Sequence, residues 1–315
     1  MAHEQVAALA KALQKNIGQV IIGKDREIEL LLTALFSGGH VLLEDVPGTG
    51  KTTLAKALAK SLSCSFARVQ FTPDLLPADI TGMRVYNQQS GTFSFIKGPA
   101  FTHVLLADEV NRATPRTQSA LLECMEERQI TEGGVTYTLE APFVVIATQN
   151  PIETQGTFPL PEAQLDRFLM RLSLGYPSAH EAVQLMQRFI RRQPLAELTA
   201  VAAGSDVLAA VKACMDVRVD EDVMRYMAAL CEAARNPDRV RLGPSPRALL
   251  ALMRACQALA AIRGRGYVIP DDVKELAIPV LAHRVVLRGV SYQTSSEGFL
   301  TELLSRVDVP TEAAP

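Results

Sequence analysis

The spacing of apolar residues changes along the chain, and it predicts strands that alternate with helices over the first half. Short apolar runs of strand length lie at Val41–Leu43, Ser65–Phe71, Val104–Glu109, Phe143–Gln149 and Leu169–Leu174. Segments with apolar residues at helical spacing separate these runs. Strands that alternate with helices favour a parallel sheet, and strands buried on both faces read as continuous apolar runs. We therefore expect an α/β organisation around an open parallel sheet.

Two further pairs of β-type runs predict antiparallel hairpins. The first pair is Met83–Tyr86 and Thr92–Ile96, and the second is Gln129–Glu132 and Val135–Thr138. The runs of the second pair are separated by Gly133-Gly134, a two-residue hairpin signal. We therefore expect both hairpins in addition to the parallel sheet.

The second half of the chain predicts helices only. From Ser178 onward β-type runs disappear, and the composition changes near Tyr176-Pro177. We therefore place a first domain at residues 1–176, a helical domain at 177–305 and a flexible tail at 306–315. The amphipathic segments of the whole chain predict helices at Glu4–Asn16, Arg26–Phe36, Thr114–Glu127, Asp220–Arg235, Pro246–Ile262 and Pro270–Arg288, the last interrupted by Pro279.

Composition and charge are those of an ordinary globular chain of two domains. Of the 315 residues, 48% are hydrophobic and 21% are charged. A net charge of −2 and a pI of about 6.2 argue against a constitutive surface for nucleic acid or another polyanion. The N-terminus does not resemble a signal peptide, and no uncharged apolar run reaches the roughly 20 residues of a membrane span. The five cysteines are far apart and predict reduced thiols of a cytoplasmic protein rather than metal ligands.

The strongest candidate chemistry lies in Val41–Thr53, where a short strand runs into a glycine loop and the chain re-emerges as a helix from Thr53. Gly48 and Gly50 let backbone N–H groups turn inward to meet an anion, and the helix start adds donors and partial positive charge. Lys51 can reach the β- and γ-phosphates of a nucleotide, and the Thr52 hydroxyl can bind Mg²⁺. The loop residues predicted to hold the nucleotide are Val46, Pro47, Gly48, Thr49, Gly50, Lys51, Thr52 and Thr53.

One position departs from the general phosphate-loop pattern G-x-x-x-x-G-K-[ST]. Asp45 stands where the pattern has its first glycine. Aspartate tolerates unusual backbone angles better than most residues, so the loop can still close. Its carboxylate must point away from the phosphates.

A second group of candidates follows the other predicted strands. Asp108 and Glu109 end one strand, and Asn150 follows another. In open parallel sheets ligands bind at the carboxyl ends of the strands. Asp108 can therefore hold the water shell of a metal, and Glu109 can polarise the attacking water. Asn150 can orient that water or contact the γ-phosphate, or it can simply cap the following loop.

Two candidates have an equally simple structural explanation. The segment Val20–Ile22 can form a wall for the adenine through Ile22, or it can only pack in the core. Arg247 directly follows a helix start at Ser245-Pro246, and a cation is unfavourable at the positive end of a helix. An anion opposite would offset this cost. That anion is either the γ-phosphate or a nearby surface carboxylate.

Taken together, these motifs resemble the AAA+ ATPases, specifically the MoxR family, over roughly residues 5 to 300. The resemblance is carried by Glu44–Thr53, Asp108–Ala113, Ala147–Pro151, Gly156–Phe168 and Gly243–Ala248. It implies an α/β P-loop core with helices on both faces of the parallel sheet, followed by a smaller all-α lid. It also implies that the predicted hairpins are a helix-2 insert at about 82–97 and a pre-sensor-1 hairpin at about 129–139.

The resemblance further implies roles for individual residues. Lys51 and Thr52 would be Walker A residues, and Asp108 and Glu109 Walker B residues. Asn150 would be sensor 1. Two arginines complete the set: Arg167, near the end of a helix that starts in Leu160–Phe168, would be the arginine finger, and Arg247 would be sensor 2.

The resemblance also implies that ATP and Mg²⁺ bind between the subunits of a ring, usually a hexamer. They commonly act as chaperone-like remodellers of protein complexes, with partners that bear von Willebrand factor A (VWA) domains. Two other readings stay open: a DNA-acting AAA+ motor, and a nucleotide-gated scaffold with little hydrolysis. Arg171, Arg112 and Arg116 are the other candidates for a trans-acting arginine.

Overall fold

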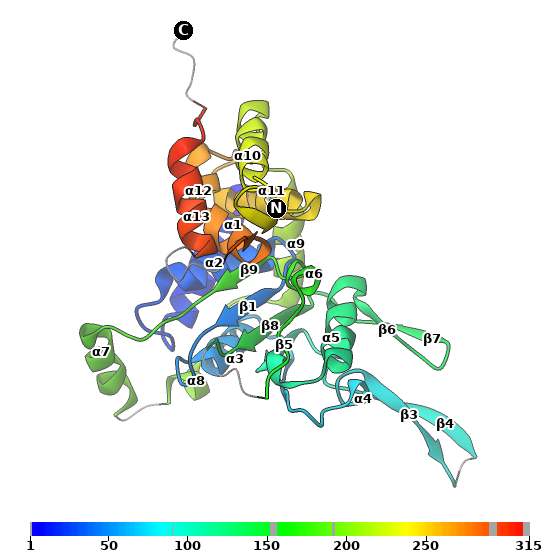
Figure 1. Cartoon of the computed structure of the whole chain (residues 1–315). Coiled ribbons are helices and arrows are strands. Elements are labelled where there is room, and N and C mark those ends of the chain that lie inside the picture. Colours follow the sequence, from blue (N-terminus) through cyan, green and yellow to red (C-terminus); the bar gives the residue numbers. More distant parts are fainter. Residues whose placement is uncertain (1, 90, 152–155, 191–192, 290–294, 311–315) are drawn as a thin grey trace.

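The computed structural model describes residues 2–89, 91–151, 156–190, 193–289 and 295–310 (Figure 1). The strands are β1 (Val41–Glu44), β2 (Phe66–Gln70), β3 (Gly82–Asn87), β4 (Thr92–Lys97), β5 (Val104–Asp108), β6 (Gln129–Glu132), β7 (Val135–Thr138), β8 (Val144–Gln149), β9 (Met170–Leu172), β10 (Val240–Leu242) and β11 (Val286–Leu287). The helices are α1 (His3–Ile17), α2 (Asp25–Phe36), α3 (Lys51–Ser61), α4 (Pro77–Thr81), α5 (Pro115–Glu127), α6 (Glu162–Leu165), α7 (Ala179–Phe189), α8 (Pro194–Glu197), α9 (Gly204–Met215), α10 (Glu221–Ala233), α11 (Pro246–Ile262), α12 (Pro270–Leu281) and α13 (Ser296–Arg306), with 3₁₀ turns η1 (Val110–Arg112) and η2 (Ala282–Arg284).

The five predicted core strands form one parallel sheet in the order β2-β5-β8-β1-β9. Successive residues of a strand face opposite sides of the sheet. Accordingly, Leu43 and Leu106 belong to one buried apolar cluster, while Leu42 and Ala107 belong to another. The first cluster includes residues of α1, α2 and α3, and the second includes residues of α5. Helices therefore cover both faces, and the predicted α/β fold is confirmed.

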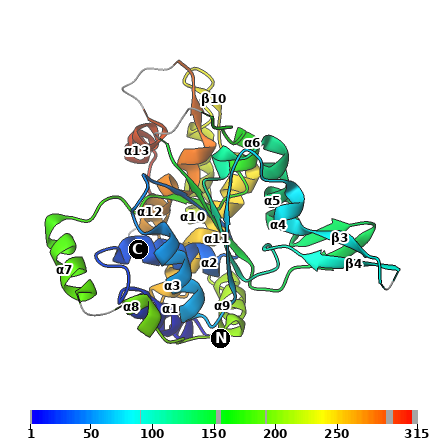
Figure 2. The ribbon, with the colours of Figure 1, turned by 90° about the horizontal axis from the view of Figure 1, so that it is seen from below.

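Both predicted hairpins are present. β3 pairs with β4 from Gly82 to Lys97, and β6 pairs with β7 across Gly133-Gly134. They extend away from the body of the molecule in both views (Figures 1 and 2). The two hairpins contact each other through Phe95 and Tyr137, whose rings stack with centroids 4.2 Å apart. They therefore form one projecting unit.

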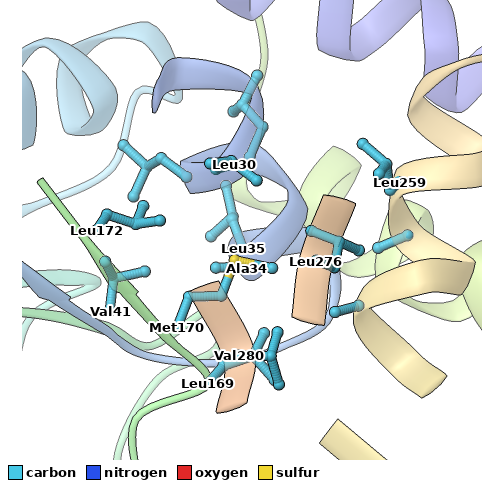
Figure 3. Packing of buried hydrophobic residues seen from close by; sticks show 14 of the residues in the cluster. Leu30, Ala34, Leu35, Val41, Leu169, Met170, Leu172, Leu259, Leu276 and Val280 are labelled. Atoms are coloured by element: carbon cyan, nitrogen blue, oxygen red, sulfur yellow. The ribbon is translucent and has the colours of Figure 1, made fainter. Parts of the chain in front are cut away.

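The helical second half packs directly on the first half. Buried side chains of α2, β1 and β9 meet those of α11 and α12 in a single apolar cluster, as Leu35, Met170, Leu259, Leu276 and Val280 illustrate (Figure 3). The cluster therefore contains residues from both sides of Tyr176-Pro177. Burial of this shared apolar surface holds the lid helices against the edge strand β9.

Three sequence-based expectations about the second half of the chain and the segment just before it were wrong. β-type structure does not end at Ser178, because β10 and β11 form a short antiparallel pair. Strands of three and two residues are too short to show a hydrophobic period in the sequence. The last long helix ends at Leu281 instead of reaching Arg288, and Pro279 lies inside it, in its final turn. The helix expected to start in Leu160–Phe168 is only the four-residue α6, which ends before Arg167.

The predicted tail begins close to the end of α13, whose last residue is Arg306. Residues 311–315 of that tail lie outside the described residues. Within the described part of the chain, every helix is too short or too polar to cross a lipid bilayer.

Candidate functional site

The glycine loop lies between the end of β1 and the start of α3, at the carboxyl edge of the sheet. Gly48 and Gly50 have φ of +87° and +93°, which side chains rarely adopt. A Cβ added at either glycine would meet no atom within 4 Å, so the space beside the loop is open. The helix starts at Lys51, two residues earlier than expected. The N–H groups of Lys51 and Thr52 therefore belong to the first turn of α3, where they can bind an anion.

The side chain of Lys51 lies across this loop. Its Nζ donates to the carbonyl oxygens of Asp45 and Val46 at 2.8 and 3.0 Å. The Thr49 hydroxyl also donates to the Val46 carbonyl, at 3.4 Å. An ammonium group has three donors, so two loop carbonyls leave Lys51 able to donate to a phosphate oxygen.

The Asp45 carboxylate is buried and points away from the phosphate loop, as predicted. It accepts hydrogen bonds from the Ser173 hydroxyl at 2.9 Å and from the backbone N–H groups of Leu174 and Gly175. Asp45 is not among the described residues with positive φ, so the unusual backbone angle that we invoked for it is not needed. Its role in the single chain is to fasten the phosphate loop to the segment after β9.

Asp108 ends β5 and is buried beside the loop. Its Oδ1 accepts a hydrogen bond from the Thr148 hydroxyl at 2.6 Å. Its Oδ2 accepts two from the Arg68 guanidinium, at 2.7 and 3.1 Å. Neither partner could be predicted from the sequence, because β2 and β8 become neighbours of β5 only through the strand order.

Glu109 is held in a left-handed conformation, with φ of +58°. Its backbone N–H donates to the Thr148 hydroxyl at 2.8 Å. Its Oε2 accepts a hydrogen bond from Gln70 at 2.8 Å and pairs with Arg112 at 2.9 Å. Non-glycine residues in this conformation cost about 1–3 kcal/mol and cluster at functional sites. Arg112, weighed as a trans-acting arginine, therefore pairs with the Glu109 of its own chain.

These groups share one cavity of about 400 Å³. Predicted residues from the ends of three strands and from the start of α3 line it, although these segments are far apart in the sequence. Asn150 lines it and is itself buried. The predicted residues among those that line it are Pro47, Gly48, Gly50, Lys51, Thr52, Thr53, Asp108, Glu109 and Asn150.

Ile22, the predicted adenine wall, is half-buried and is not among the residues that line this cavity. The neighbouring Gly23 lies directly against α7, since a Cβ there would come within 1.9 Å of the Glu181 carboxylate. The segment before α2 is therefore packed against α7.

Arg167 and Arg247 lie elsewhere, around a second cavity of about 310 Å³. Both pair with Glu126, Arg167 through Nε at 2.7 Å and Arg247 through Nη1 at 2.8 Å. In the single chain Arg247 thus faces a nearby carboxylate and not a phosphate. Glu126 lies in the last turn of α5, and no local sequence pattern predicts its role.

The two cavities lie at opposite ends of the parallel strands: the first at their carboxyl ends and the second at their amino ends. The second is lined by Gly39 and His40, which precede β1, and by Leu169, which precedes β9. The phosphate loop instead follows β1, whose four residues span about 13 Å. Helix α5 also runs from the Glu109 end toward Glu126, and its thirteen residues span about 20 Å.

Of the other candidate arginines, Arg171 pairs with Glu44 at 3.0 Å and with Glu297 at 3.0 Å. It therefore joins the end of β1 to α13 within the chain. Arg116 is exposed in the first turn of α5.

The donor set at the carboxyl edge fits a Mg²⁺–nucleotide complex. Mg²⁺ prefers oxygen ligands and usually takes one or two protein groups together with phosphates and water. The Thr52 hydroxyl and the Asp108 carboxylate supply such oxygens in one cavity. The open space beside Gly48 and Gly50 admits a polyphosphate.

Comparison with known proteins agrees with the fold. Residues 40–170 match the ATPase family associated with various cellular activities (AAA), and residues 232–302 match the AAA lid domain. A protein of Bacillus subtilis named YeaC, uncharacterized, is 46% identical over 96% of this chain and 95% of its own length. Chaperone MoxR1 of Mycobacterium tuberculosis is 40% identical over 98% of this chain and 85% of its own length.

A crystal structure from Cytophaga hutchinsonii, assigned as an ATPase, superposes with a TM-score of 0.89 at 38% identity and covers 98% of both chains. The fold and site therefore define an AAA+ protein with a P-loop core and a helical lid. The chain belongs to the MoxR family of AAA+ ATPases.

Proposed function

We propose that this protein hydrolyses ATP at the interfaces of a ring of identical subunits. One observation carries the proposal. The residues suited to bind and cleave a triphosphate lie at one edge of the sheet, while Arg167 and Arg247 lie at the other. If Arg167 and Arg247 act on a γ-phosphate, that phosphate must then be bound by a neighbouring subunit. A head-to-tail contact of this kind repeats around a closed ring.

Within one site, each residue has a definite task. The phosphate loop and Lys51 bind the triphosphate, while Thr52 and Asp108 hold Mg²⁺. This ion would neutralise charge on the phosphates. Glu109 accepts a proton from the attacking water, and Asn150 orients that water. Arg167 and Arg247 of the neighbouring subunit stabilise the charge of the transition state, a contribution of about 10³–10⁵ in rate for an arginine finger.

The ring would use this cycle for chaperone-like remodelling or activation of protein complexes. A relative with 40% identity bears the name Chaperone MoxR1. A hexamer, a VWA-domain partner and a client complex follow from the family resemblance. The projecting hairpin unit offers exposed apolar side chains, such as Met83, Val85 and Ile96, for contact with such proteins.

Mixed rings test the trans arrangement. Arg167→Ala should leave ATP binding intact and nearly abolish turnover, while Glu109→Gln should bind ATP and not cleave it. In an equal mixture, about one interface in four joins an intact Glu109 to an intact Arg167. Activity should therefore return to roughly a quarter of the wild-type rate. Arg225→Ala, which removes an exposed arginine of α10, is the matched control.

Two results would refute the proposal: normal turnover by the Arg167→Ala protein, or no recovery in the mixture. Strong stimulation by DNA at a stated salt concentration would instead favour a DNA-acting motor. Failure of wild-type rings to cleave ATP in a single turnover would favour a scaffold.

A further inference from the structure

Glu126 is the carboxylate that holds the two arginines together. Its side chain is 35% exposed at the end of α5. Each of its oxygens accepts a hydrogen bond from one arginine: Oε2 from Arg167 and Oε1 from Arg247. Two guanidinium groups repel each other, so a shared carboxylate between them offsets this repulsion. Hydrogen bonds from both arginines hold the pKa of Glu126 below its usual value, so the carboxylate stays charged near neutral pH.

The nitrogen atoms that Glu126 uses are informative. It accepts a hydrogen bond from Nε of Arg167, the guanidinium nitrogen nearest the main chain. A guanidinium has five N–H donors in a planar fork. The bond to Glu126 therefore fixes the plane of the Arg167 guanidinium without using its two terminal nitrogens. Those two terminal nitrogens can together make a bidentate contact with a phosphate.

Hydrogen bonds tie together the elements that carry this group. The buried His40 ring accepts from the Val145 N–H at 3.0 Å and contacts the Met125 carbonyl at 3.0 Å, next to Glu126. On the other side, Asp166 accepts from the Ser245 hydroxyl at 2.9 Å and pairs with the buried Arg284. These contacts fasten the end of α5 and tie the segment before Arg167 to the start of α11.

We propose that Glu126 is a positioning residue for hydrolysis in the neighbouring subunit, because it sets the spacing and orientation of Arg167 and Arg247. Glu126 has this role only if the proposed function holds, since both arginines must act on the neighbour's γ-phosphate. Its own nucleotide cavity lies at the other edge of the sheet, so Glu126 affects turnover without contact with its own ATP.

The first test separates turnover from binding. Glu126→Ala should lower kcat by about 10–100-fold, because small displacements of catalytic groups have effects of this size. The KM for ATP should change by less than about twofold. Glu126→Gln, whose amide offers a single acceptor oxygen, should fall between wild type and alanine. Glu127→Ala, an equal change of charge one residue later, should behave as wild type.

The second test uses mixed rings and distinguishes positioning from misfolding. Glu126→Ala subunits keep an intact Glu109, and Glu109→Gln subunits keep the complete arginine group. Their equal mixture should recover roughly a quarter of the wild-type rate, as in the Arg167→Ala mixture. A general folding defect would not be rescued by a partner subunit.

The outcomes are distinct. Recovery with Arg167→Ala but not with Glu126→Ala would overturn the role of Glu126 and leave the proposed function intact. A wild-type kcat for Glu126→Ala would do the same. No recovery in either mixture would overturn both.

Discussion

Asp45 allows a sharp prediction, because its replacement by glycine restores the general phosphate-loop pattern. On sequence grounds Asp45→Gly should be harmless or favourable. In the structure, however, the buried Asp45 carboxylate accepts three hydrogen bonds from the segment Ser173–Gly175. We therefore expect Asp45→Gly to destabilise the fold.

The expected magnitude follows from these bonds. A hydrogen bond to a charged group contributes about 1.5–3 kcal/mol, and an orphaned buried donor costs about 1–3 kcal/mol. The three bonds share one carboxylate, so their sum overestimates the effect. We expect Asp45→Gly to lower the free energy of unfolding by about 3–5 kcal/mol. With about 2.1 cal/mol/K of unfolding entropy per residue over 315 residues, the thermal midpoint should fall by about 5–8 °C.

Differential scanning calorimetry measures this shift directly. Ser173→Ala removes only the hydroxyl donor and should cost about 1.5–3 kcal/mol, which gives a graded comparison. An Asp45→Gly protein that unfolds at the wild-type temperature, or above it, would refute the assigned role of the carboxylate. The same reasoning predicts that Asp45→Gly loses more stability than Ser173→Ala.

Three further predictions concern single side chains. Burial lowers the pKa of His40 from 6.5 to about 4, so its contribution to stability is fully present above pH 6.5 and falls by up to about 3 kcal/mol as the pH drops toward 4. Urea titrations should show this slope, and His40→Gln should reduce it. A slope of the same sign should remain from the buried His283, whose pKa is also lowered. Arg68 donates to the Asp108 carboxylate, so its positive charge opposes Mg²⁺ at the same carboxylate. Arg68→Gln should therefore lower the Mg²⁺ concentration needed for binding of a fluorescent ATP analogue. A higher Mg²⁺ requirement would show that Arg68 does not oppose the ion. Arg265 makes a bidentate pair with Asp272, which is 1% exposed. Arg265→Met should lower the free energy of unfolding in chemical denaturation by about 3 kcal/mol, because it leaves a buried carboxylate without its partner. An unchanged midpoint would show that the pair contributes little.

Features that depend on neighbouring residues could be predicted from the sequence. The core strands follow from continuous apolar runs, because strands buried on both faces need no polar positions. The second hairpin follows from Gly133-Gly134, where both residues have positive φ. The phosphate loop follows from Gly48 and Gly50 in the same way. In each case the backbone conformation depends on a few adjacent residues.

The tertiary structure alone decided which side chains meet. Arg68 reaches Asp108 only because β2 lies beside β5 in the sheet. Arg167 and Arg247 are 80 residues apart in the chain. Both pair with Glu126, which belongs to a third element, helix α5. Such contacts depend on strand order and helix packing, which no local pattern specifies. The sequence by itself therefore determined the chemistry of the nucleotide site, and the fold placed the arginine pair in a different cavity, away from the phosphate loop of its own chain.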